Sequence, residues 1–266
     1  MEGLNVGKKA KQRFIATGKK LLFFLCFLGL WQLIVTVFQI KVFILPSPVA
    51  VMKALFDSRY QWWDHIFATS GEIILSFLVT AVVGVGLSLL IAWSKFLNKL
   101  IMPIIVLFNS LPKIALAPLF LMWFGYGLVP NILVATLIAF FPVVINTTTG
   151  LHEVESDLLD LVHYLNASKL QVFMKIRIPN SLPYIFAGFK IAATMCVVGA
   201  IVGEFIASSK GLGYLLRDAQ AFINTPPMFA CLLLLSFLGL LFFTIIGLLE
   251  RICMPWNFKE GGEMEQ

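Results

Sequence analysis

The segment DLVHYLNASKLQVFMKIRIPNSLP, residues 160–183, is polar in a chain that is otherwise apolar nearly from end to end. Apolar residues recur at helical spacing on both sides of Asn166-Ala167-Ser168, in two sets: Leu158, Leu161, Val162 and Leu165, then Leu170, Phe173 and Ile176. Asn tolerates a left-handed backbone and Ser caps helices. The pattern therefore predicts a helix, a turn and a short helix, with Pro179 and Pro183 at the start of the next helix.

The rest of the composition places this segment in a membrane protein. Of 266 residues, 59% are hydrophobic and 13% are charged, and the mean hydropathy is +0.92. Soluble domains are about a quarter charged, so this much apolar surface indicates a polytopic membrane chain. The four cysteines lie in or beside apolar runs without a CxxC pair, which predicts neither a disulfide framework nor a metal site.

Six stretches are apolar and long enough to cross a bilayer, which needs about 20 residues. The third is interrupted by Pro103, Pro112, Lys113 and Pro118. The chain is thus expected to be all-α, with about six transmembrane helices: Leu21–Ile40, Ile73–Trp93, Leu100 to about Phe124, Leu128–Asn146, about Pro183–Ala207 and about Met228–Leu249.

The basic residues predict the orientation of these spans. With the N-terminus inside, 13 Lys and Arg residues fall in cytoplasmic segments and 5 in external ones. This bias predicts both termini in the cytoplasm, and it explains the net charge of +6 without nucleic-acid binding. The expected organisation is a cytoplasmic tail over 1–20, a membrane domain over 21–250 with a cytoplasmic loop at about 150–182, and a cytoplasmic tail over 251–266.

Two external elements and four charged residues complete the expected layout. Ile44–His65 resembles a Pro-initiated amphipathic helix, and Ser208–Pro227 begins with a Gly211/Gly213 turn. Lys113 and Glu204 lie within spans, where charges are costly and often functional, so both are candidate pathway residues. Lys113 suits an anionic solute, whereas Glu204 favours a structural or gating pair. Glu72 and Lys190 are expected to reach interfacial water near span ends.

The polar segment resembles the EAA signature in the membrane subunits of ATP-binding-cassette (ABC) importers. Asp160 stands at the acidic position, and Leu161 and Val162 replace its alanines. Asn166 replaces the glycine, and Ala167 and Ser168 fit the pattern. Ile176 falls ten residues after Asn166, as the signature requires, and Ile178-Pro179 replaces Leu-Pro.

Four further stretches, FILPSPVAV (43–51), LPKIALAPLFLMWFGYG (111–127), FFPVVINTTTGL (140–151) and VVGAIVGEFIASSKGLGYLL (197–216), resemble the nitrate, sulfonate, taurine and bicarbonate branch of these permeases. The similarity runs from about Trp31 to Trp256. It implies the type I importer permease fold with a cytoplasmic coupling helix, in a multi-pass protein of the bacterial inner membrane.

The resemblance implies partners and roles. Two permease subunits, expected to be identical, would form the pathway, a cytoplasmic ATPase dimer would drive it, and an extracytoplasmic binding protein would deliver the solute. No GxxxxGK[ST] loop occurs in the sequence, so ATP hydrolysis is expected in a separate chain and no cofactor is expected here. The resemblance assigns coupling to one set of residues: Asp160 as a bracing acid, Asn166, Ala167, Ser168, Lys169 and Leu170 as the contact tip, Phe173 as an apolar plug, and Ile176 and Pro179.

The sequence leaves more than one solute and more than one energy source open. The solute is expected to be a small anion, such as a sulfonate, nitrate or bicarbonate, or a heteroaromatic vitamin precursor. The alternative function is an ATP-independent secondary carrier or channel, in which the polar segment would need no partner. A membrane-embedded enzyme is disfavoured, because His65, His152 and His163 do not converge at one depth and no HExxH spacing occurs.

Overall fold

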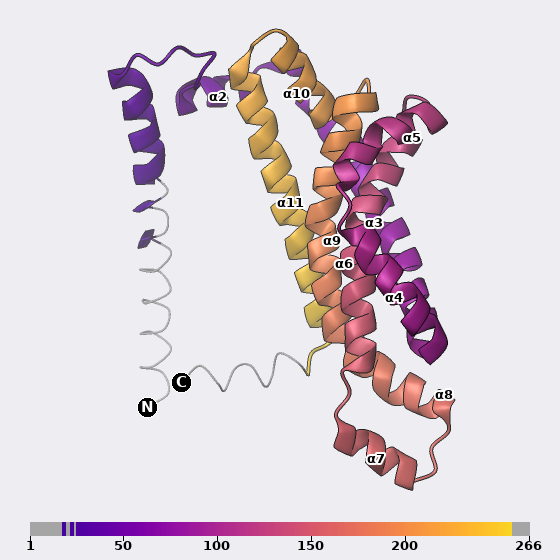
Figure 1. Ribbon diagram of the computed structural model, residues 1–266. Helices are drawn as coiled ribbons and strands as arrows, with labels where there is room; N and C mark the ends of the chain where they lie inside the picture. The colour runs from indigo at the N-terminus through magenta and orange to yellow at the C-terminus, as the bar shows by residue number, and fades with distance from the viewer. Residues whose placement is uncertain (1–17, 20–21, 24, 257–266) are drawn as a thin grey trace, which may run out of the picture. The chain divides into compact units, whose positions relative to one another are not determined.

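A computed structural model describes residues 18–19, 22–23 and 25–256, and every regular element in that part is helical. The helices, labelled in Figure 1, are α2 (Pro48–Leu55), η1 (Ser58–Tyr60), α3 (Trp62–Trp93), α4 (Lys95–Asn109), η2 (Lys113–Leu116), α5 (Ala117–Phe124), α6 (Leu128–His152), α7 (Ser156–Tyr164), α8 (Lys169–Val172), η3 (Phe173–Arg177), α9 (Ile178–Ala207), α10 (Leu212–Ala221) and α11 (Thr225–Cys253), preceded by a shorter apolar helix, Leu25–Val37.

The described residues fall into two compact units, one within 1–60 and 218–232 and the other within 61–217 and 233–266. In the smaller unit, Ser47 caps α2 through a bond from the Ala50 N–H, and Pro48 occupies the first turn. This matches the predicted Pro-initiated helix. The hydroxyl of Thr225 donates to the Val42 carbonyl within the same unit.

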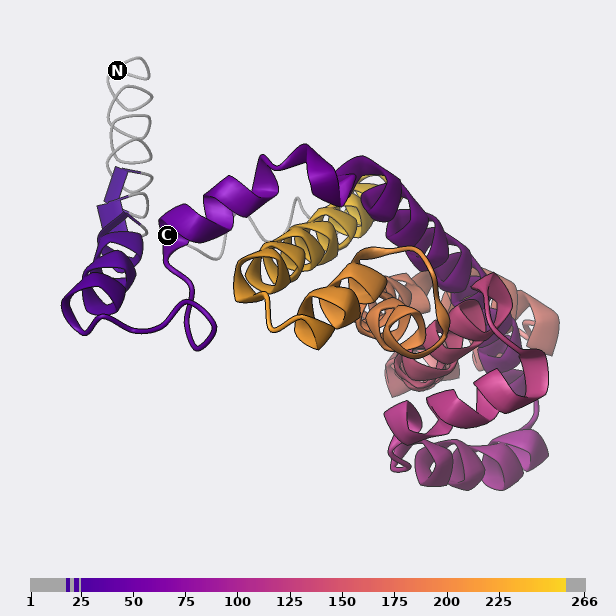
Figure 2. The ribbon, with the colours of Figure 1, turned by 90° about the horizontal axis from the view of Figure 1, so that it is seen from above.

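The larger unit is built around α3, α6 and α9, which pack against one another along their lengths (Figure 1). α4 and α5 both contact α6, and the view in Figure 2 places them on one flank of it. Many large apolar side chains on α3 and α11 are exposed, as expected for helices surrounded by lipid.

Small residues let α6 and α9 approach closely. A Cβ added at Gly199 would overlap Ala135, lying 2.9 Å from its Cβ, and one added at Gly203 would lie 2.7 Å from the Cα of Asn131. Contacts between small residues are the usual basis of tight packing between membrane helices. The pair α6 and α9 is therefore the centre of the fold.

The predicted spans are recovered with two changes. Four helices, α3, α6, α11 and the continuous run Lys169–Ile206, are long and apolar enough to span a membrane. The third predicted span is instead a bent pair, α4 with η2 and α5, whose two parts meet at 85°. The described part of the first predicted span, Leu21–Ile40, forms the shorter helix Leu25–Val37, and part of that span and of both tails lies outside the described residues.

Two helix boundaries differ from the predicted ones. α3 begins at Trp62 rather than Ile73, so residues expected in an external element form its first turns. The short helix after the turn does not stop before the next span, because α8, η3 and α9 form one run of 38 residues. The segment η3 is a π-helix that precedes Pro179, and such a wider turn suits a residue that lacks an N–H and crowds the preceding carbonyl.

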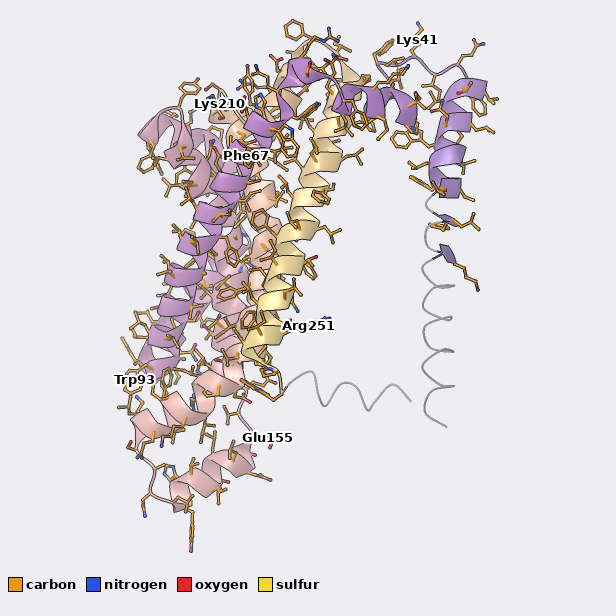
Figure 3. The ribbon with its side chains drawn as sticks, turned by 180° about the vertical axis from the view of Figure 1, so that it is seen from behind. Lys41, Phe67, Trp93, Glu155, Lys210 and Arg251 are labelled. Carbon is orange, nitrogen blue, oxygen red and sulfur yellow. The ribbon has the colours of Figure 1, made fainter. Side chains whose placement is uncertain are left out.

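The two ends of α3 define the two ends of the larger unit. Its 32 residues correspond to about 48 Å of helix, which exceeds the hydrocarbon thickness of a bilayer. Figure 3 shows Phe67 and Lys210 at one end of this unit and Trp93 and Glu155 at the other. The polar segment 156–177 lies at the Trp93 end, and the turn between α9 and α10 lies at the other.

Candidate functional site

The polar segment folds as the predicted helix, turn and helix. α7 is followed by Asn166, whose φ of 53° is left-handed. Ser168 then begins α8 with a reciprocal capping box. Its hydroxyl accepts from the Gln171 N–H at 3.3 Å, and its own N–H donates to Gln171 Oε1 at 2.8 Å. Asn and Ser thus fix the turn in the way that their side chains favour.

Two residues of this segment hold it to the end of α3. Lys169 Nζ donates to the carbonyl of Trp93 at 2.7 Å and lies 4.6 Å from the centre of the indole ring. Phe173 is buried and meets the same ring edge to face, with centroids 5.1 Å apart. Trp93, which was not among the predicted site residues, is therefore the residue of α3 that Lys169 and Phe173 both contact.

The rest of the segment presents apolar side chains to solvent. Tyr164 is 86% exposed and Leu165 67%, although neither lies in a membrane-spanning helix. Other exposed apolar side chains of the segment are Leu158, Leu161, Leu170 and Met174. Asp160 is exposed in the middle of α7, Ala167 and Ile176 are half-buried, and Pro179 lies in the first turn of α9. An exposed apolar set on a short helical hairpin is typical of a surface that a protein partner covers.

A cavity of ≈ 690 Å³ separates the polar segment from the end of α3 and the start of α4. Among its lining residues are five that carry or can acquire positive charge: Lys95, His152, His163, Lys169 and Arg177. Arg177 donates to the Leu151 carbonyl at 3.3 Å. The cavity shows that the segment is held at a few points instead of being packed along its whole length.

Lys113 lies in η2, at the bend between α4 and α5, as the proline pattern suggested. Its Nζ donates to the carbonyl of Asn109 at 2.8 Å and to Oδ1 of the same residue at 3.0 Å. The amine also lies 5.0 Å from the centre of the Phe141 ring. The cation is therefore held at a break in the helix, where it is half-exposed.

Glu204 is buried near the end of the larger unit that lies opposite the hairpin 156–177. Its Oε1 accepts from the Thr69 hydroxyl at 2.6 Å, and its Oε2 accepts from the Gly213 N–H at 2.6 Å. Gly211, with a φ of 109°, packs directly against the carboxyl group and leaves no room for a side chain. Glu204 thus closes the turn between α9 and α10, and it does not lie in the same place as Lys113.

The expectation for Glu72 was wrong, and Lys190 has a partner that was not expected. Glu72 does not reach the interface, because α3 begins ten residues before it and the side chain is buried, accepting from Asn131 Nδ2 at 2.9 Å. Lys190 has a side chain that is 28% exposed, and it forms an ion pair with Glu250 of α11. The opposite charges near the ends of the fifth and sixth predicted spans were the available signal for that pair.

Helices long and apolar enough to span a membrane, a bent helix pair and a helical hairpin at one end define the class of a polytopic helical membrane protein. Comparison of families identifies it further. Residues 83–252 match the model of the family described as binding-protein-dependent transport system inner membrane component. The chain belongs to this family.

Named relatives cover nearly the whole chain. It is 34% identical over 90% of its length to the formylaminopyrimidine transport permease protein ThiX of Halalkalibacterium halodurans, of which 96% is covered. It is 31% identical over 96% of its length to the putative aliphatic sulfonates transport permease protein SsuC of Bacillus subtilis, of which 94% is covered. These two relatives are named for solutes of different chemistry.

The fold also resembles a solved structure, an inward-facing conformation of the MetNI methionine ABC transporter. The match has a TM-score of 0.65 at 20% identity and covers 74% of this chain and 99% of that one. The protein is therefore the permease subunit of a binding-protein-dependent ABC importer of small solutes, a multi-pass protein of the inner membrane. Its system includes a binding protein and an ATPase in a separate chain, so the alternative of an ATP-independent carrier is not retained.

Proposed function

We propose that the hairpin 156–177 is the surface on which the ATPase subunit docks. The observation that supports this most directly is its set of exposed apolar side chains, above all Tyr164, Leu165 and Leu170. A helix presented by a membrane protein can fill a groove on a soluble partner. The same hairpin is tied to α3 through Lys169 and Phe173, so movement of the docked ATPase would reach the spans directly.

Within this proposal the residues divide into contacts and anchors. Asn166, Ala167, Ser168 and Leu170 form the contact tip, and Asp160 braces α7 on the exposed side. Three residues join the tip to the membrane helices: Phe173 as an anchor on Trp93, and Ile176 and Pro179 in the run that leads into α9. Lys169 belongs to both groups, since it starts α8 and holds Trp93.

Co-purification tests this docking surface. The tagged permease is expressed with the ATPase and binding protein of its host, and wild type is compared with Leu170→Glu, which adds a charge to an apolar side chain that is 59% exposed. The variant is expected to lose the ATPase while remaining folded. Phe56→Glu is the matched control, because Phe56 is an exposed apolar residue just after α2. Retention of the ATPase by Leu170→Glu would remove the hairpin as the docking surface.

The proposed assembly is a pair of identical permease subunits with two ATPase subunits, with both termini of the permease in the cytoplasm. The excess of Lys and Arg in the segments assigned inside supports this orientation. Single cysteines placed at residue 3 and residue 262, in a background lacking the four native cysteines, test it. A membrane-impermeant thiol reagent should label neither in intact cells and both in inverted vesicles. Labelling of either one in intact cells would reverse the assignment.

The proposed solute is a small anion or a heteroaromatic vitamin precursor, and Lys113 distinguishes the two. Its amine uses the two oxygens of Asn109, and an ammonium carries three donors. Uptake of the ligand that co-purifies with the binding protein is compared for Lys113→Arg and Lys113→Gln. If the solute is an anion that passes this residue, Lys113→Gln raises KM and Lys113→Arg does not. Unchanged uptake by Lys113→Gln would remove Lys113 from the pathway.

A further inference from the structure

The end of the larger unit at which α3 begins contains a buried polar cluster. This cluster has no part in the proposed docking of the ATPase on the hairpin. Its members are contributed by three helices and are almost inaccessible to solvent: Thr69 and Glu72 from α3, Asn131 from α6 and Glu204 from α9, with exposed fractions of 0%, 4%, 0% and 0%. Two carboxyl groups this deep in a membrane protein are unusual, because a buried charge without compensation is costly. Their hydrogen bonds show how each carboxyl group is accommodated.

Each carboxyl oxygen of Glu204 accepts a hydrogen bond. The Thr69 hydroxyl and the Gly213 N–H each donate to a different carboxyl oxygen at 2.6 Å. Thr69 is itself oriented by the Leu212 N–H, which donates to its oxygen at 2.9 Å. An ionised carboxylate accepts hydrogen bonds and donates none, so two donors and no facing acceptor suit the ionised form of Glu204.

Glu72 has the opposite arrangement. Its Oε1 accepts from Asn131 Nδ2 at 2.9 Å, but its Oε2 is buried without a partner, and so is Asn131 Oδ1. With Glu72 ionised, both unsatisfied atoms are acceptors, and each would be left unpaired in the protein interior. Buried polar atoms are nearly always paired, and leaving one unpaired costs about 1–3 kcal/mol.

A proton on Glu72 would serve both atoms, because Nδ2 and Oδ1 belong to one amide group and Oε1 and Oε2 to one carboxyl group. A carboxylic acid is a donor at one oxygen and an acceptor at the other. Its Oε2–H would donate to Asn131 Oδ1 while the amide of Asn131 continues to donate to Oε1. The acid and the amide then form a head-to-head pair with two hydrogen bonds between α3 and α6.

No cation in the described part of this cluster offsets a second negative charge. His65 Nδ1 accepts from the Gly211 N–H at 2.9 Å, so this nitrogen carries no proton and the ring is the neutral tautomer. Arg217 donates to the carbonyls of Phe205 and Ser208, while Lys210 and Asp64 are exposed to solvent. Among the described residues, neither glutamate forms an ion pair.

We propose that Glu72 is a proton-binding site: it is held as a neutral carboxylic acid whose Oε2–H donates to Asn131, so that the two buried glutamates share a single negative charge, on Glu204. This assignment follows the rule that two neighbouring acids in different environments take different protonation states. It joins α3 to α6 through an uncharged pair.

Infrared spectroscopy of the purified permease at pH 7 tests the proposal. A protonated carboxylic acid has a carbonyl band separate from those of carboxylates and amides. The band is expected in wild type, is expected to disappear in Glu72→Gln, and is expected to persist in Glu204→Gln. Loss of the band in Glu204→Gln with retention in Glu72→Gln would place the proton on Glu204 and overturn the assignment, as would the absence of any band from wild type.

Thermal unfolding gives an independent readout. Glu72→Gln keeps one donor and one acceptor toward Asn131, so its midpoint is expected to equal that of wild type. Glu204→Gln sets an amide NH₂ against the Thr69 hydroxyl or the Gly213 N–H, so its midpoint is expected to fall. Equal losses in the two variants would refute a protonated Glu72. A wild-type midpoint that drops when Na⁺ is replaced by choline, but not in Glu72→Gln, would identify a bound cation instead of a proton.

Discussion

Lys169 binds Trp93 twice, through a hydrogen bond of 2.7 Å from Nζ to the backbone carbonyl and through an approach of 4.6 Å to the centre of the indole ring. The two residues are 76 positions apart in the sequence. One lies at the start of the hairpin's second helix and the other at the last residue of α3. The contact therefore links the proposed docking surface to a membrane span.

We predict that Lys169→Met loosens the start of α8. The substitution keeps the length of the side chain but removes the donor and the cation above the ring, and a cation–π contact at an exposed site is worth about 0.5–1 kcal/mol. Amide hydrogen exchange over residues 169–177 should become up to about five-fold faster. Lys169→Arg retains both interactions and should exchange at the wild-type rate.

Lys95→Met is the control for this change. Lys95 lines the same cavity, so the variant removes an equal charge from the same place without touching the contact with Trp93. It should leave exchange over 169–177 unchanged. Equal acceleration by Lys95→Met and Lys169→Met would show that the charge of the cavity, and not the bond to Trp93, holds the helix.

We predict that Gly199→Ala destabilises the larger unit. Its new Cβ would overlap the backbone and the Cβ of Ala135, so α6 and α9 would have to move apart. Overpacking of this kind costs about 1–3 kcal/mol, measurable as a loss of unfolding free energy in mixed micelles. Gly86→Ala is the matched control, since a Cβ added at Gly86 meets nothing within 4 Å. It should be neutral or slightly stabilising, because Ala favours a helix more than Gly does. Equal effects would contradict the close approach at Gly199.

We predict that Lys190→Met destabilises the protein through Glu250. The two side chains are 28% and 10% exposed, so removing the cation leaves a mostly buried carboxylate without its ion-pair partner. Breaking a buried pair costs about 3–5 kcal/mol, and the partial exposure places the expected loss at the lower end. Adding Glu250→Gln to Lys190→Met should recover part of the lost unfolding free energy. A double variant less stable than Lys190→Met would show that the carboxylate is held by other groups.

The sequence predicted the apolar regions better than the helices that they form, since about six spans were expected and four single helices are long and apolar enough to cross a membrane. Apolar length identifies α6 and α11, because hydropathy reports lipid exposure and burial together. It did not identify the start of α3 at Trp62, since Asp64 and His65 end a stretch that resembles an external element, and the polar Thr69 and Glu72 follow it. These side chains are tolerated in a helix because other helices cover several of them, and that cover is a tertiary property that one sequence does not display.

The candidate site was predictable where local chemistry decides it. Asn166 and Ser168 form the turn and the cap expected of them, because both effects act within a few residues. The contact of Lys169 with Trp93 and the pairing of Glu72 with Asn131 were not predictable, since they join residues 76 and 59 positions apart. A residue type alone does not reveal which distant partner the fold brings to it.

The backbone of Asn166 supplies a last prediction. Its φ of 53° lies in the left-handed region, which costs most L-residues about 1–2 kcal/mol and glycine almost nothing. Asn166→Gly, which restores the residue typical of the EAA signature, should therefore keep the hairpin and the bound ATPase. Asn166→Val should lose both, because a β-branched side chain is least compatible with this conformation. The two variants are compared by hydrogen exchange over 160–172 and by ATPase co-purification. If Asn166→Val retained protection and partner alike, the turn would not depend on the left-handed residue, and the hairpin would be held by Lys169 and Phe173 alone.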